Sequence, residues 1–159
     1  LVGNFRDAGA DGIFLVVQHA NADEDADGMY RSQGLKWAQE CLEAAGSDAL
    51  NLVHLHGAGV SETLGEEFKN AIIHFSFSEN TALKTRLDDT PSIAISGGPQ
   101  SGWLAQASCE EIETATQSLI EDMRGRSFLL SAGCVLHPST PTRNIAAMLK
   151  MARHREVWV

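Results

Sequence analysis

Residues 127–153, SFLLSAGCVLHPSTPTRNIAAMLKMAR, contain the unit from which the fold of this chain can be read. Residues 127–134 form an apolar run of strand length. A helix is predicted after them, with Thr140 as its cap and Pro141 at its first position. Towards the amino terminus, four further apolar segments of similar length occur, at residues 12–18, 50–56, 71–77 and 92–96. Strands that are apolar almost throughout are typical of a parallel sheet covered on both faces.

Helices are predicted between these segments. One covers residues 29–45, shorter ones cover 61–70 and 81–87, and another begins at Ser108, with Glu111 at the spacing of a capping box. Strand and helix therefore alternate five times, which indicates an α/β fold, either an open doubly wound sheet or a (β/α)8 barrel. A complete barrel has eight strands and typically ~250 residues, whereas this chain has 159 residues. We therefore predict a partial TIM barrel of five C-terminal βα units with parallel strands, without the first three strands.

Composition excludes several classes of function. The chain has 12 Lys and Arg against 21 Asp and Glu, a net charge of -9, which argues against non-specific nucleic-acid binding. No apolar run reaches the ~18 residues of a membrane span. Three scattered cysteines, Cys41, Cys109 and Cys134, do not make a disulfide framework, and they suggest a reducing, cytoplasmic location. The acidic stretch 21–27, NADEDAD, is expected to be a surface loop.

Polar residues gather at the carboxyl ends of the predicted strands, where α/β proteins place their active sites. The glycines of the 96–99 turn, SGGP, either let backbone approach a ligand or form a tight turn. We predict that the substrate contacts residues from four of these ends, namely Gln18, His19, Ser76, Gly97, Gly98 and Cys134.

A metal site is a second prediction from the strand ends. His54 and His56 are two residues apart on one strand, so their side chains point to the same face. Cys134 would join them if the sheet curls, and two imidazoles with one thiolate suit a zinc site with an open fourth position. The alternative is that the two histidines hydrogen-bond in a polar pocket without metal. His74, inside a strand, is expected to be a hydrogen-bonded core histidine.

Four of these stretches together resemble the uroporphyrinogen decarboxylase family. They are GADGIFLVVQHAN at 9–21, HLHG at 54–57, SGGP at 96–99 and, most specifically, the segment 127–153. The resemblance runs from about residue 9 to 153. It implies a (β/α)8 barrel of which residues 1–159 supply the C-terminal portion, from the fourth strand to the eighth.

The family that this chain resembles has two main chemistries. Decarboxylases remove acetate carboxyls from uroporphyrinogen without a cofactor, and their essential Asp and Arg residues would lie before this segment. Gln18 stands where they have a Ser that contacts substrate, and Cys134 where they have a His. The related methyltransferases move a methyl group between a corrinoid and a thiol. Their zinc ligands, a His-x-Cys and a Gly-Cys, are matched by His54, His56 and Cys134, so one Cys is replaced by His.

The first functional prediction is therefore a carboxy-lyase acting on a tetrapyrrole, with no cofactor. The alternative is a zinc-dependent methyltransferase acting between a corrinoid and a thiol. A third possibility is an inactive or binding-only fragment. Five strands alone leave two sheet edges and an apolar interior exposed, so we expect a homodimer or pairing with the missing N-terminal half.

Overall fold

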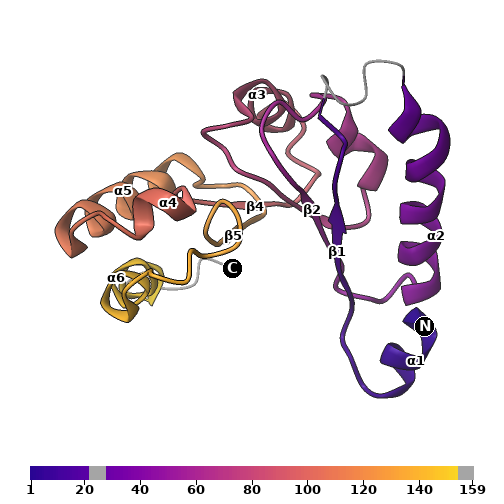
Figure 1. The fold of residues 1–159 in the computed structure, drawn as a ribbon, viewed down its shortest axis with the longest axis horizontal. Coiled ribbons are helices and arrows are strands. Elements are labelled where there is room, and N and C mark those ends of the chain that lie inside the picture. The colour runs from indigo at the N-terminus through magenta and orange to yellow at the C-terminus, as the bar shows by residue number, and fades with distance from the viewer. Residues whose placement is uncertain (22–27, 154–159) are drawn as a thin grey trace.

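A computed structural model describes residues 1–21 and 28–153 of the chain, so the acidic stretch lies, apart from Asn21, outside the described residues. Within this part, five parallel strands form one sheet in which each strand pairs with the next in chain order (Figure 1). Helices alternate with the strands, and the predicted α/β fold with the strand order of a partial TIM barrel is confirmed. The strands are β1 Phe14–Val17, β2 Leu52–Leu55, β3 Ile72–His74, β4 Ile95–Gly97 and β5 Phe128–Leu130.

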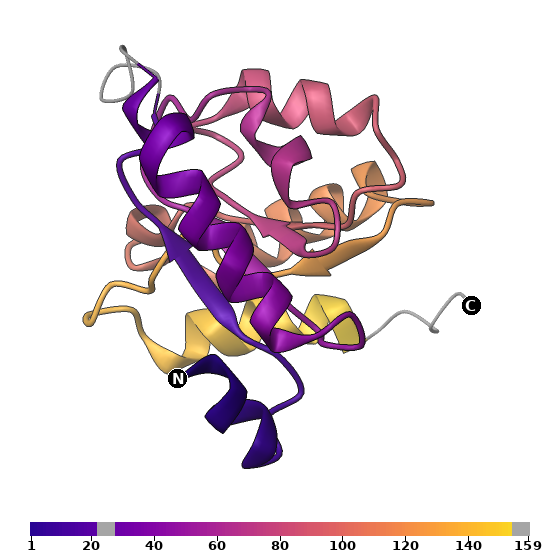
Figure 2. The same ribbon diagram turned by 90° about the vertical axis from the view of Figure 1, so that its right-hand side faces the viewer.

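The helices fall into groups along the sheet. Figures 1 and 2 show α1 and α2 at the β1 end of the molecule and α4, α5 and α6 together at the β5 end. No helix in residues 1–21 and 28–153 has the length and apolar character to cross a membrane. The helices are α1 Val2–Asp7, the π-helix η1 Tyr30–Gly34 continuing into α2 Leu35–Ala45, the 3-10 helix η2 Leu64–Phe68, α3 Thr81–Asp88, α4 Ser101–Leu104, α5 Cys109–Asp122 and α6 Thr142–Arg153.

Two helix starts test the sequence prediction. The capping box at α5 is confirmed, because the Ser108 side chain accepts from the Glu111 N–H and the Glu111 carboxylate accepts from the Ser108 N–H. The prediction for α6 was wrong by one residue. The carbonyl of Pro141 accepts the Asn144 N–H at 2.9 Å, so Pro141 is the cap, and the Thr140 N–H donates to the His137 carbonyl in the preceding turn.

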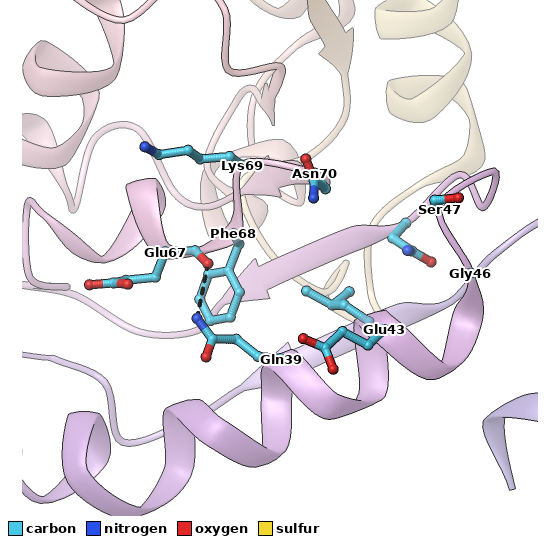
Figure 3. Close-up of a pocket in the computed structure, with 10 residues that line it drawn as sticks. Gln39, Glu43, Gly46, Ser47, Glu67, Phe68, Lys69 and Asn70 are labelled. Atoms are coloured by element: carbon cyan, nitrogen blue, oxygen red, sulfur yellow. Dashed lines mark hydrogen bonds between the residues drawn. The ribbon is translucent and has the colours of Figure 1, made fainter.

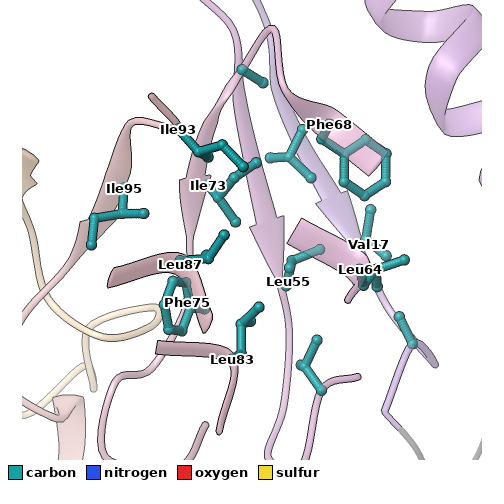
Figure 4. Packing of buried hydrophobic residues seen from close by; sticks show 14 of the residues in the cluster. Val17, Leu55, Leu64, Phe68, Ile73, Phe75, Leu83, Leu87, Ile93 and Ile95 are labelled. Atoms are coloured by element: carbon teal, nitrogen blue, oxygen red, sulfur yellow. The ribbon is translucent and has the colours of Figure 1, made fainter. Parts of the chain in front are cut away.

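The two faces of the sheet differ in environment. On the outer face, alternate strand residues pack against the helices in one continuous apolar core. On the inner face, large apolar side chains stay open to solvent: Phe14 is 58% exposed, Val16 46% and Leu129 45%. This is the face that a closed barrel encloses. Figure 4 shows the outer core, with Val17, Leu55, Leu64, Phe68, Ile73, Phe75, Leu83, Leu87, Ile93 and Ile95 labelled.

Candidate functional site

A row of buried polar side chains crosses the inner face of the sheet. The register of the parallel strands places His54 of β2 beside His74 of β3, and His74 beside Ser96 of β4. Residues paired in this way face the same side of a sheet, so the three form one line, which we call the inner row. All three are buried, and His54 is only 3% exposed. Polar groups buried there must be hydrogen-bonded to be tolerated.

Cys134 reaches this row from the segment that follows β5. In a flat sheet β2 and β5 would lie three strand spacings apart, about 14 Å. The Cys134 Sγ atom is instead 3.5 Å from His54 Nε2 and 3.6 Å from His56 Nδ1. The sheet and the segment after β5 therefore curl over the inner face and bring the three residues together.

The spacing of these three donor atoms can be compared with that of a metal site. With Zn–N of about 2.05 Å and Zn–S of about 2.3 Å, tetrahedral angles put two nitrogens about 3.3 Å apart and a nitrogen and a sulfur about 3.6 Å apart. His54 Nε2 and His56 Nδ1 are 3.3 Å apart. With the two sulfur distances, all three edges agree with a tetrahedral site of two nitrogens and one sulfur, and the three atoms could hold one zinc ion.

The histidines of the inner row are neutral at neutral pH. The pKa of His54 is lowered to about 4, chiefly by burial and further by the neighbouring imidazoles of His74 and His56. Burial also lowers the pKa of His74, against a smaller opposing effect of its hydrogen bond to the Ala132 carbonyl. A neutral imidazole is the form that binds a metal, so burial keeps His54 ready to act as a ligand.

A pocket of about 270 Å³ opens beside the three donor atoms. Ser76 is buried in its wall, and the Ser76 hydroxyl has no hydrogen-bond partner within the described residues. A polar group of a bound molecule could satisfy it. Ser101 donates its hydroxyl to the Cys134 carbonyl at 3.0 Å and so holds the cysteine in place. The lining residues are His54, Leu55, His56, Gly57, Ala58, Ser76, Glu79, Gln100, Ser101, Gly133 and Cys134.

Four of the residues predicted to contact substrate do not line this pocket. Gln18 and His19 are exposed residues just after β1. Gly97 and Gly98 instead have packing reasons to be glycine. A Cβ on Gly97 would lie 2.4 Å from the Phe77 ring, and one on Gly98 would lie 1.9 Å from the Ser131 carbonyl oxygen. Of the six predicted contacts, the pocket contains Ser76 and Cys134.

A larger hollow, about 750 Å³, lies between α2 and η2 (Figure 3). Asn51 and Asn70, which precede β2 and β3, belong to its lining, so it lies at the end of the strands opposite to the donor atoms. Its lining, among the residues that the structure describes, includes no His or Cys, and a long hydrogen bond of 3.4 Å joins Gln39 to the Glu67 carbonyl across it. In TIM-barrel enzymes the active site lies at the opposite, carboxyl-terminal face of the barrel.

Sequence reasoning missed the part that His74 plays in the site. The prediction treated it as a core histidine, and it is buried and hydrogen-bonded. However, its Nδ1 atom also lies 2.8 Å from His54 Nδ1. The available signal was the single imidazole within the apolar segment 71–77, whose parallel pairing with 50–56 would place it beside His54.

Asn80 was also missed. It is buried after β3, and its side-chain amide bonds to the backbone of Val60, Gly57 and Ser76, which ties the loop after β2 to the loop after β3. Both loops carry residues of the pocket. The available signal was only that Asn80 follows the third apolar segment, before a predicted helix, where an Asn side chain commonly bonds to backbone.

Comparison with known proteins adds a family and a fold. The family model described as Uroporphyrinogen decarboxylase (URO-D) matches residues 2–155. Among solved structures, a methyltransferase from Methanosarcina mazei is similar, with a TM-score of 0.74 and 17% sequence identity. The likeness covers 96% of this chain and 44% of that one, so the chain spans less than half the length of this structural relative. No curated protein matches the sequence.

Proposed function

The chain belongs to the uroporphyrinogen decarboxylase family, and from this premise we propose that it supplies the zinc-holding half of a methyltransferase of that family. The observation that carries the proposal is the set of three donor distances, 3.3, 3.5 and 3.6 Å, which agree with a tetrahedral site of two nitrogens and one sulfur. The fold likeness to a protein named as a methyltransferase is consistent with it.

In this proposal His54 Nε2, His56 Nδ1 and Cys134 Sγ hold the ion, and the fourth position is left for a substrate thiol. When bound, zinc supplies the positive charge that lowers the pKa of that thiol and makes its sulfur nucleophilic. The pocket beside the donor atoms would receive the rest of the thiol substrate. The unpartnered hydroxyl of Ser76 would orient the substrate by a hydrogen bond.

The methyl donor in this proposal is a methylated corrinoid. The substrate sulfur would form a bond to the methyl carbon while the bond from that carbon to the corrinoid breaks, and the corrinoid keeps the electron pair. The chain's own part is to orient the thiol so that its sulfur faces the donor. Such positioning contributes much of the rate when two substrates must meet in one geometry.

Decarboxylation of a tetrapyrrole, the first prediction from sequence, would need cationic residues that the family resemblance places before this segment. A substrate with many carboxylates needs cationic partners, and Arg is the residue best suited to bind them. Over the described part of the chain, the pocket lining includes no Lys or Arg. The positive support for the metal-dependent alternative is the group of two imidazoles and one thiol at this pocket.

Zinc binding by the purified chain tests this proposal. We expect about one zinc per chain by elemental analysis after dialysis, and competition for zinc with a chromophoric chelator. Cys134→Ala and His56→Ala should each lose this binding. The matched controls are Cys109→Ala, a thiol on α5 near Asn144, and His137→Ala, an exposed imidazole beside Ser139; both should bind zinc like the wild type. A wild-type chain that binds no zinc but binds uroporphyrin would refute the proposal and support the lyase.

A further inference from the structure

His74 links a backbone carbonyl to the first of the three donor residues. Its Nε2 atom lies 2.8 Å from the carbonyl oxygen of Ala132, and its Nδ1 atom lies 2.8 Å from Nδ1 of His54. The other ring nitrogen of His54, Nε2, faces His56 and Cys134. The two imidazoles therefore connect the segment after β5 to the donor atoms through two short contacts.

The contact between His74 and the Ala132 carbonyl determines which imidazole nitrogens carry the protons. A carbonyl oxygen only accepts, so Nε2 of His74 must carry the hydrogen. A neutral imidazole has one N–H, and Nδ1 of His74 is then an acceptor. The 2.8 Å contact is a hydrogen bond only if Nδ1 of His54 donates. This leaves Nε2 of His54 with a free lone pair, directed at the other two donors.

We propose that His74 is a positioning residue that fixes His54 as its Nδ1–H tautomer and so directs the Nε2 lone pair into the site. The inference rests on the proposed zinc site and deepens it, since a metal ligand must present a lone pair. Outer partners of ligating histidines hold the ring and the tautomer in this way, and their loss typically weakens metal binding by 10- to 100-fold.

The segment 131–134 supplies both the carbonyl that anchors His74 and the proposed ligand Cys134. Ala132, which fixes the proton of His74, is two residues before Cys134. Ser131 donates to the same Ala132 carbonyl at 3.0 Å, and its hydroxyl also contacts that of Ser96. The position of this segment therefore determines where the Cys134 sulfur lies and, through His74, how the His54 ring is oriented. Displacing the segment would disturb two of the three donors together.

The tautomer can be measured in the metal-free protein by 1H–15N correlation spectra of the imidazole nitrogens. We expect the wild type to show His54 protonated on Nδ1 and His74 protonated on Nε2. A wild-type spectrum with His54 protonated on Nε2 overturns the proposal, whatever the variants do. This readout needs no metal, so it decides the inference even if the chain binds no zinc and the proposed function fails.

Two substitutions at position 74 then test the consequence for zinc. His74→Leu keeps the approximate size but removes the acceptor, and it should weaken zinc affinity 10- to 100-fold. His74→Asn places an amide oxygen near the position of Nδ1, where it can accept from His54, and should recover most of that loss. His137→Leu, the same substitution at an exposed imidazole beside Ser139, is the control and should leave the affinity within about threefold. Equal affinity in wild type and His74→Leu, or equal losses in the Leu and Asn variants, would overturn the positioning role.

Discussion

Asn80→Ala removes a side chain that joins two loops of the pocket. The amide oxygen of Asn80 accepts the Val60 N–H at 2.7 Å, and the amide nitrogen donates to the carbonyls of Gly57 and Ser76, both at 3.0 Å. Asn80 is 3% exposed, and Val60 and Ser76 are also buried. A buried backbone group left without a partner costs about 1–3 kcal/mol. Because water can reach the half-buried Gly57, we expect a total loss of about 3 kcal/mol in the free energy of unfolding.

Urea denaturation followed by circular dichroism measures this loss. A change of that size corresponds to a fall in Tm of roughly 6–12 °C for a domain of this length. Asn70→Ala, at an exposed position, is the control and should change stability by less than about 0.5 kcal/mol. Asn80→Asp keeps the volume of the side chain but changes its hydrogen bonds, so it distinguishes the two effects. It keeps the acceptor for Val60 but sets a carboxylate oxygen against two carbonyls, so it should destabilise at least as much as Ala. A loss below about 1 kcal/mol in both variants would refute the bridging role.

Two further predictions concern the scaffold around the site. Gly98→Ala should lower stability by about 2 kcal/mol or more in the same assay, because its Cβ would lie 1.9 Å from the Ser131 carbonyl oxygen and force β4 and β5 apart. Gly3→Ala, with no atom within 4 Å of its Cβ, is the control, and equal effects would contradict the reasoning. Ser108→Ala should reduce the amount by which the free energy of unfolding falls at acid pH. Hydrogen bonds from Ser108 lower the pKa of Glu111 from its ordinary 4.5, so this cap stabilises the chain above pH 4.5, and the stabilisation is lost as the pH falls through the lowered value. Unchanged acid sensitivity in the variant would refute the linkage.

The fold could be predicted because its signals are local. Each apolar segment is of strand length and is followed by polar, helix-forming sequence, and alternation of this kind permits few topologies. The errors are also local. Pro141 forms the cap of α6 because its carbonyl accepts the first helical hydrogen bond. The short helix α4 was not predicted, since its four residues depend on the Gln100 side chain, which accepts from the Trp103 N–H.

The candidate site was only partly predictable because its geometry depends on distant segments. The shared face of His54 and His56 follows from the two-residue repeat of a strand. The approach of Cys134 depends on how far the sheet curls, and no local pattern records that curvature. For Gly97 and Gly98 the sequence left two explanations open, close approach to a ligand or a tight turn. The folded chain adds a packing reason that no local pattern records, since a Cβ at these positions would clash with Phe77 and with the Ser131 carbonyl.

The inner row explains why a histidine interrupts an apolar strand. The interior of a barrel is normally filled by branched apolar side chains, and burying an imidazole there costs free energy unless both ring nitrogens have partners. His74 meets this condition with Ala132 on one side and His54 on the other. His54 meets it only in part within the protein, since its Nε2 has just the weak contacts with His56 and Cys134 at 3.3 and 3.5 Å. Hydrogen bonds thus offset the cost of burying His74, whereas the lone pair on His54 Nε2 has no strong hydrogen-bond partner within the described residues. An ion held by His54, His56 and Cys134, as we propose, would give His54 Nε2 the partner that it lacks.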